Sequence, residues 1–251
     1  MHQIQSKMNL YELVVTDTEK IALDDLLFSE ENKLALTQII KEHKYIDELK
    51  KYNLKVDNKI LLHGHSGCGK TTTAKAIATA LNKSIVIINL STLINAKIGE
   101  TSKNVKAIFD KAIREKAVLF LDEFDQIGKS RDNDDKDVAE LKRLVNTIIQ
   151  LIDYFPTDSL LICATNYYNS IDTALLRRFQ VKLQFEMPDQ EQLNVYYEKL
   201  LADFPVHFQD IPRKYSISYA EAKDYIHTTM KRQIIAELEL KEQQKLNEVI
   251  Q

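Results

Sequence analysis

The chain of 251 residues is long enough to bury a sizeable core, and a composition of 44% hydrophobic and 28% charged residues excludes disordered and fibrous proteins. Its 34 lysines and arginines nearly balance 37 aspartates and glutamates, and a formal charge of −3 gives no general attraction to nucleic acid or to an anionic membrane. No apolar run reaches the roughly 18 residues of a membrane span, no secretory leader pattern opens the chain, and only two cysteines occur, so we expect a soluble cytoplasmic protein.

Five short apolar, β-branched runs predict strands, at residues 59–63, 85–89, 117–121, 160–164 and 181–185. Helical patterns separate them: TTTAKAIATALN follows the first run directly, and apolar residues recur at helical spacing over 100–116 and 138–153. This alternation predicts an α/β fold, with a parallel five-stranded sheet that carries helices on both faces.

After PDQEQ (188–192) the strand-like runs stop. One face of a long helix is then marked by Tyr219, Ala222, Ile226, Met230 and Ile234. The pattern predicts a small helical second domain.

HGHSGCGKTTT (63–73) contains Gly64, four intervening residues, and then Gly69, Lys70 and Thr71, which is the spacing of a phosphate-binding loop. Glycines let backbone N–H groups converge on phosphate oxygens, Lys70 can reach the terminal phosphates, and the Thr71 hydroxyl can ligate Mg²⁺. From the loop and the helix that follows it, the predicted nucleotide contacts are Ser66, Gly67, Cys68, Gly69, Lys70, Thr71 and Thr72.

AVLFLDEFD (117–125) ends a predicted strand in two carboxylates, at the sheet edge where ligands gather in open α/β sheets. We expect Asp122 to hold the shell of Mg²⁺ with Thr71, and Glu123 to polarise the attacking water. Asn166 follows the next strand, and there it is either a turn residue or a group that orients the water or senses the γ-phosphate of ATP. In the company of these carboxylates we expect the second role.

DTALLRRF (172–179) places Arg177 and Arg178 just before the last strand. Arginines of this kind stabilise charge on a transferring phosphoryl group, often from another subunit. A solvated basic turn is the alternative.

These motifs together resemble those of AAA-type ATPases of the AAA+ superfamily, from about Ile21 to the end. HGHSGCGKT resembles Walker A, AVLFLDEFDQIG Walker B, ATN sensor 1, and ALLRRF the paired arginine fingers. The resemblance implies a homo-oligomeric ring, usually a hexamer, in which Arg177 and Arg178 reach ATP bound by the neighbour. It also implies an adenine contact near Asp25 and Leu26, and three parts: a short segment 1–20, an ATPase core 21–188, and a helical lid 189–251.

The sequence departs from the family pattern in two places. Lys97 stands where the loop facing the central pore usually carries an aromatic residue, so it either lines a pore with positive charge or is an exposed lysine without a pore role. His65 and Ser66 stand where the family often has two prolines, which removes no ligand.

The sequence leaves three classes of function open for the movement that ATP hydrolysis would drive. The chain is either a motor that remodels or unfolds a protein client, or an ATP-gated switch that controls a separately encoded effector such as a protease. A nucleic-acid loader is the third class, and the charge of −3 without a basic helix argues against it. The roughly 20 residues before the ATPase pattern are fewer than a folded recognition domain needs, so we expect the pore, the lid or a partner to select the substrate.

Overall fold

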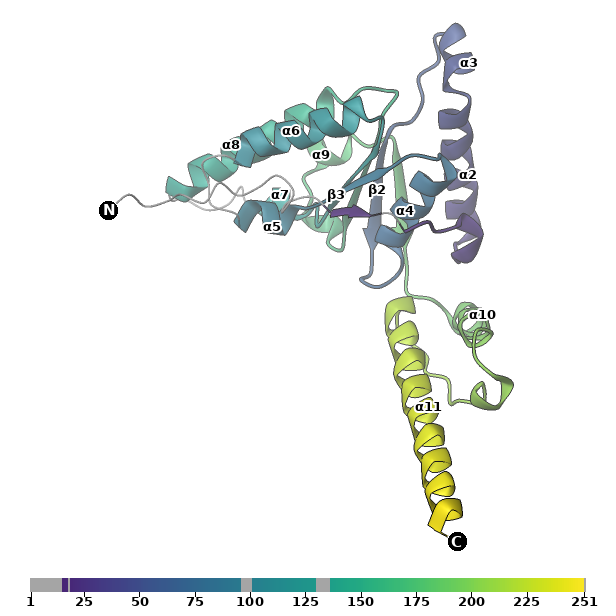
Figure 1. Ribbon diagram of the computed structural model, residues 1–251. Helices are drawn as coiled ribbons and strands as arrows, with labels where there is room; N and C mark the ends of the chain where they lie inside the picture. The colour runs from purple at the N-terminus through teal and green to yellow at the C-terminus, as the bar shows by residue number, and fades with distance from the viewer. Residues whose placement is uncertain (1–14, 18, 96–100, 130–135, 251) are drawn as a thin grey trace. The chain divides into compact units, whose positions relative to one another are not determined.

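The computed structural model describes residues 15–17, 19–95, 101–129 and 136–250 (Figure 1). By its internal contacts the chain divides into two units, a sheet unit and a helical unit. The sheet unit comprises the chain up to Gly64 together with Lys70–Phe185, and the helical unit comprises His65–Gly69 and the chain from Glu186 onward. The domain boundaries expected from the sequence stay a prediction.

The sheet unit is built on strands that pair in the order β1-β3-β4-β5-β2-β6. The strands are β1 (Val15–Asp17), β2 (Lys59–Gly64), β3 (Ile85–Asn89), β4 (Val118–Asp122), β5 (Leu160–Thr165) and β6 (Val181–Phe185). Strands β2 to β6 pair in parallel, and β1 is antiparallel to β3. The predicted parallel sheet is therefore confirmed. The sequence gives no signal for β1, because three residues are too short for a periodic pattern.

Helices connect the parallel strands and cover them. They are α2 (Glu30–Lys44), α3 (Ile46–Lys51), α4 (Lys70–Ala80), α5 (Leu90–Asn95), α6 (Thr101–Arg114), α7 (Gln126–Lys129), α8 (Lys136–Asp153) and α9 (Thr173–Leu176), with short 3-10 turns η1 (Leu23–Asp25) and η2 (Tyr168–Ser170). Figure 1 shows α6 and α8 on one side of the strands and α4 on the other. Because β4 and β5 are covered on both faces, they read as continuous apolar runs.

The core of the sheet unit explains the apolar periodicity of the two long helices. On α6, Ile108 and Phe109 are fully buried, and on α8 Ile148 is buried with them against Leu119 and Leu161 of the sheet. The buried residues of each helix recur every three or four positions, so one stripe of each helix faces the strands. Burial of apolar area supplies about 25 cal/mol per Å², so this layer contributes to the stability of the sheet unit.

The helical unit has a core of its own. It contains α10 (Gln190–Leu201), the 3-10 turn η3 (Val206–Phe208) and α11 (Tyr219–Ile250). Its buried members are Leu193, Tyr197, Leu201, Ile211, Ala222, Ile226 and Met230. Past these residues α11 continues with Ile235, Leu238 and Leu240, which are 55%, 53% and 59% exposed. Among the helices of the described ranges, none combines the length and the apolar content needed to cross a bilayer.

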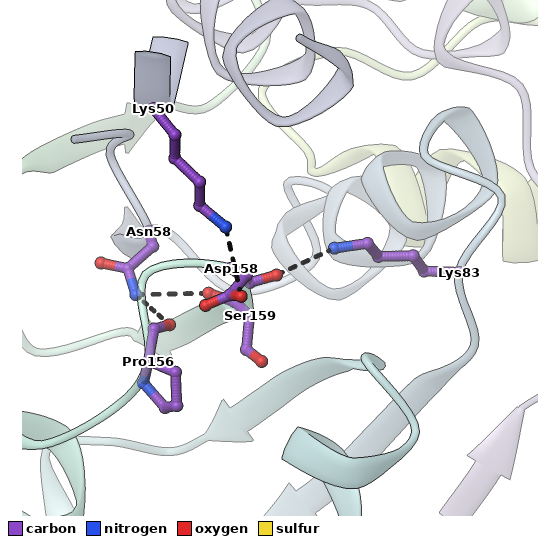
Figure 2. A network of polar contacts seen from close by, with 6 residues as sticks. All are labelled: Lys50, Asn58, Lys83, Pro156, Asp158 and Ser159. Carbon is purple, nitrogen blue, oxygen red and sulfur yellow. Dashed lines mark hydrogen bonds and ion pairs between the residues drawn. The ribbon is translucent and has the colours of Figure 1, made fainter. Parts of the chain in front are cut away.

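A buried amide joins the loops at the amino ends of β2 and β5 (Figure 2). Asn58, which is 1% exposed, donates from Nδ2 to the carbonyl oxygens of Pro156, at 2.7 Å, and Ser159, at 3.2 Å. Its Oδ1 accepts from Nε2 of Gln180 at 3.3 Å. The Asn58 side chain is thus hydrogen-bonded to the segments that precede β5 and β6, while Asn58 itself precedes β2, and these three strands are neighbours in the sheet.

Asp158 lies in the same loop and accepts hydrogen bonds from two lysines (Figure 2). Lys50 donates to its carboxylate at 3.3 Å, and Lys83 donates to its backbone carbonyl at 3.4 Å. A hydrogen bond from its own backbone N–H, with the contribution of Lys50, holds the pKa of Asp158 below its ordinary value. The amino edge of the sheet is therefore closed by polar contacts between loops.

We predict that Asn58→Ala lowers the free energy of unfolding by about 1–3 kcal/mol, because it removes the amide that donates to the carbonyls of Pro156 and Ser159, and the carbonyl of Pro156 then keeps only the N–H of Ser159. Urea unfolding followed by circular dichroism measures the change. Asn146→Ala, on an exposed position of α8, is the matched control and should stay within about 0.5 kcal/mol of the parent. Equal stability of both variants would contradict the role of Asn58.

Candidate nucleotide site

The carboxyl ends of β4, β5 and β2 lie next to one another, and they carry most of the residues that the sequence analysis selects. Lys70 and Thr71 open α4 in the chain segment after β2, Asp122 ends β4, Glu123 follows it, and Asn166 follows β5. The structure brings the start of α4 and the end of β4 into direct contact: the Thr71 hydroxyl donates to Oδ2 of Asp122 at 3.3 Å, across 51 positions of the sequence.

Lys70 is 8% exposed, and its Nζ donates to the carbonyl oxygen of Gly64 at 2.9 Å. The contact holds the ammonium at the carboxyl end of β2, beside the loop that the lysine follows. A positive group in this position attracts anions such as phosphate.

Asp122 accepts two hydrogen bonds, from the Thr71 hydroxyl and, at 2.9 Å, from the backbone N–H of Glu123. Burial raises the pKa of Asp122 above its ordinary value, and these two hydrogen bonds and the charge of Lys70 oppose that rise. A carboxylate oxygen beside a threonine hydroxyl is an oxygen-only donor pair, which fits a hard cation such as Mg²⁺. In the described ranges no group of three or more His, Cys, Asp or Glu side chains gathers to form a metal site.

Glu123 has a backbone φ of 55°, in the left-handed region that non-glycine residues rarely adopt. The chain turns there, and the next N–H, of Phe124, donates to the carbonyl oxygen of Ala164 on β5 at 2.8 Å. Such strained residues persist only where the surrounding structure holds them, and they concentrate at functional sites.

Asn166 is exposed at the end of β5, and buried contacts flank it. The hydroxyl of Thr165 donates to Oδ1 of Asp125 at 2.9 Å, and it accepts from the backbone N–H of Tyr167 at 2.9 Å. The sequence analysis missed Asp125 and Thr165, because nothing in their spacing shows that they meet. Tyr168, two positions on, stacks on the ring of His63 with centroids 4.2 Å apart.

Arg177 and Arg178 lie away from these strand ends. They precede β6, and the adjacent Gln180 N–H donates to the carbonyl of Lys59, at the amino end of β2. The five residues of β6 separate the two arginines from the carboxyl edge of the sheet, and at about 3.3 Å per residue this is a distance of roughly 15 Å. The structure therefore does not bring the two arginines together with Lys70, Asp122 and Glu123 of the same chain.

Arg178 is held by an acid that the sequence analysis did not select. Its Nε and Nη2 donate to the two carboxylate oxygens of Asp153, at 2.6 and 3.0 Å, and its Nη1 donates to the carbonyl of Ala174 at 2.6 Å. Arg177, the next residue toward the N-terminus, is exposed. The two arginines thus differ in their surroundings.

The loop 65–69 groups with the helical unit. The N–H of Ala220 donates to the carbonyl of Gly67 at 3.1 Å, and a Cβ on Gly67 would lie 2.5 Å from Oγ of Ser218. Positive φ values of 72° at Gly67 and 94° at Gly69 give the loop its tight path. Cys68 is 4% exposed, and its thiol lies 3.8 Å from the sulfur of Met187. The contact with Ala220 had no signal in the sequence.

The segment selected for adenine, at Asp25 and Leu26, lies in and just after η1, which contacts α4. The backbone N–H of Ile21 donates to the Thr79 hydroxyl at 3.3 Å, and Lys75 pairs with Glu19 at 2.9 Å. The helix that begins with Lys70 thus anchors this segment. The functional roles of Asp25, Leu26 and the other selected residues stay predictions.

Comparisons with known proteins agree on one family. The model described as "ATPase family associated with various cellular activities (AAA)" matches residues 60–187. An uncharacterized AAA family ATPase of Sinorhizobium fredii, y4kL, is 32% identical over 231 residues, which are 91% of this chain and 70% of that protein. The solved structure of the FIGL-1 AAA domain in complex with ADP has a TM-score of 0.69 at 25% identity, and the match covers 84% of this chain and 73% of that one.

Two further relatives carry names linked to proteolysis. A proteasome-associated ATPase of Mycobacterium bovis is 32% identical over 191 residues, covering 64% of this chain and 30% of that protein. A putative 26S proteasome regulatory subunit homolog of Methanothermobacter thermautotrophicus is 28% identical over 228 residues, covering 86% and 59%. The chain thus spans 59% of the length of one of these relatives and 30% of the other.

We predict that Gly64→Ala lowers the free energy of unfolding by at least about 1–3 kcal/mol. Gly64 has a φ of 131°, and an added Cβ would lie 2.0 Å from the carbonyl oxygen of Phe185, which is backbone of the paired strand β6. Gly69→Ala is the matched control, because its φ of 94° is also positive but a Cβ there meets nothing within 4 Å. Thermal or urea unfolding of both variants checks the difference, and a loss at Gly69 equal to that at Gly64 would contradict the clash.

Proposed function

The chain belongs to the AAA family of ATPases, and from that membership we propose that it hydrolyses ATP with Mg²⁺ in a ring of identical subunits, usually a hexamer, and uses the cycle to remodel a protein client. The observation that carries the proposal is the hydrogen bond from Thr71, which follows Lys70 at the start of α4, to Asp122 at the carboxyl end of β4, where Glu123 comes next in the chain. These are the residue types that nucleotide hydrolysis needs: a cation for phosphate, two oxygen ligands for a metal ion, and a carboxylate for water.

Each residue then has one task. The backbone of Ser66, Gly67, Cys68 and Gly69, together with Lys70 and Thr72, holds the phosphates, and Asp25 and Leu26 contact adenine. Thr71 and Asp122 would hold Mg²⁺, and the ion would supply positive charge for the phosphate oxygens. Glu123 accepts a proton from the attacking water, and Asn166 orients that water.

The arginines complete the site of a neighbouring subunit. Within one chain Arg177 and Arg178 belong to the amino edge of the sheet, whereas Lys70 and Asp122 belong to the carboxyl edge. This separation supports a site assembled from two protomers, in which Arg177, the exposed member of the pair, reaches the γ-phosphate. Hydrolysis is then a property of the assembly.

A second function is favoured by the names of two relatives. A proteasome-associated ATPase and a 26S proteasome regulatory subunit homolog are similar to this chain, which supports an ATP-gated partner of a separately encoded effector such as a protease. An effector that stays bound through purification, and whose activity follows the nucleotide state, would favour this switch over independent remodelling. Lys97, which the sequence analysis assigns to a pore loop, lies outside the described residues, so its role stays a prediction.

We predict that Glu123→Gln lowers ATP turnover by at least about 100-fold while ATP still binds, because the amide keeps the shape of the side chain but cannot accept the proton. Phosphate release measures turnover, and a fluorescent nucleotide measures binding. Glu115→Gln, an exposed position after α6, is the control and should keep the parental rate. Undiminished hydrolysis by Glu123→Gln would reject the assignment of the base.

We further predict that turnover per chain rises with protein concentration and that two inactive variants restore each other. Arg177→Ala should lose about 1000-fold in turnover, and mixing it with Glu123→Gln should regain part of the rate. Mixed assemblies contain interfaces where the base of one chain meets the arginine of the other. The proposal of a shared site would be overturned if dilute monomers turned over ATP as fast as concentrated chains. It would also be overturned if mixtures of the two variants were as inactive as each variant alone.

A further inference from the structure

The strand ladder between β4 and β5 ends before the residues that carry the proposed chemistry. The last paired positions are Leu121 and Cys163, whereas Glu123 and Asn166 lie two and three residues farther along their chains. Regular β pairing therefore does not fix the position of the proposed base relative to the proposed water-orienting amide. Other contacts must do so, because a shift of about 1 Å in such a pair costs on the order of 100-fold in rate.

Two contacts continue the link past the end of the ladder. The N–H of Phe124 donates to the carbonyl of Ala164 at 2.8 Å, and the hydroxyl of Thr165 donates to Oδ1 of Asp125 at 2.9 Å. The first joins backbone to backbone. The second joins two side chains that are 2% and 1% exposed, at Asp125 and Thr165, across 40 positions of the sequence.

The two residues of the side-chain contact are close in sequence to the proposed base, Glu123, and to the proposed water-orienting residue, Asn166. Asp125 is two positions after Glu123, and Thr165 directly precedes Asn166. The same Thr165 oxygen accepts from the N–H of Tyr167, so one hydroxyl group holds the chain on both sides of Asn166. On the other strand, Glu123 keeps a left-handed φ of 55°, a conformation that needs support from its surroundings.

From this arrangement we infer that Asp125 and Thr165 are positioning residues of the ATPase reaction, which set the distance between the Glu123 carboxylate and the Asn166 amide. The inference rests on the proposed function of Glu123 and Asn166. Neither positioning side chain touches the nucleotide. Their bond acts through the backbone at Glu123 and Asn166, because a buried hydrogen bond to a carboxylate is short, directional and protected from competition with water.

Removal of the hydroxyl tests the inference. Thr165→Val keeps the shape of the side chain but can neither donate to Asp125 nor accept from Tyr167. We expect kcat for ATP to fall about 10-fold or more, with KM and the affinity for a fluorescent ADP analogue changed less than about 3-fold. Thr165→Ser restores the hydroxyl and should recover most of kcat. A role in folding alone would instead lower the fraction of active protein without this split between kcat and KM.

Controls separate the possible failures. Thr37→Val removes an exposed hydroxyl that bonds to the carbonyl of Lys33 on α2, and it should leave kcat at the parental value. Should Thr165→Val not fold, Asp125→Asn provides the second variant, since it weakens the acceptor while keeping its size, and kcat should again fall with KM unchanged. All assays use the full chain at a concentration where the parental rate has reached its plateau.

The outcomes are distinguishable from those of the proposed function. Parental kcat in Thr165→Val and in Asp125→Asn, together with an inactive Glu123→Gln, would overturn the positioning role and leave the ATPase assignment standing. The positioning role would also be overturned if kcat in Thr165→Ser were no higher than in Thr165→Val. Parental turnover in Glu123→Gln would instead remove the proposed base, and with it the premise of this inference.

Discussion

The parallel pairing of β2 to β6 is the constraint on which the rest of the molecule depends. Parallel strands all end at the same edge, so every residue that follows a strand is brought to one place, however far apart these residues are in the sequence. The pairing is stable because both faces of the sheet are covered, and residues such as Phe120 and Ile162 are fully buried. A slip of one residue would move each side chain to the opposite face, so the core also fixes the register.

The two edges of this sheet differ in chemistry. The carboxyl edge carries the hydroxyl of Thr71 and the carboxylate of Asp122, with the strained backbone of Glu123 beside them. At the amino edge Asn58 closes the loops, and Asp153 holds the guanidinium of Arg178. The proposed site shared between two subunits depends on this difference, because it takes its nucleotide contacts from one edge and its arginines from the other.

The division between the units falls on both sides of the loop 65–69, after Gly64 and after Gly69. The loop carbonyl of Gly67 accepts from the N–H of Ala220, at the start of the longest helix, α11. The loop is therefore hydrogen-bonded to α11 within the helical unit.

The sequence by itself determined the family, the parallel strands and the identities of the residues proposed for phosphate, metal and water. These features are local: a glycine loop before Lys70, or an apolar run that ends in Asp122, is legible from neighbours in the chain. Only the tertiary structure decided that Thr71 meets Asp122, that Thr165 meets Asp125, that Arg178 pairs with Asp153, and that β1 adds an antiparallel edge. Each of these depends on which strands become neighbours, and that order is set by the packing of helices on the whole sheet, a long-range property that no local pattern encodes.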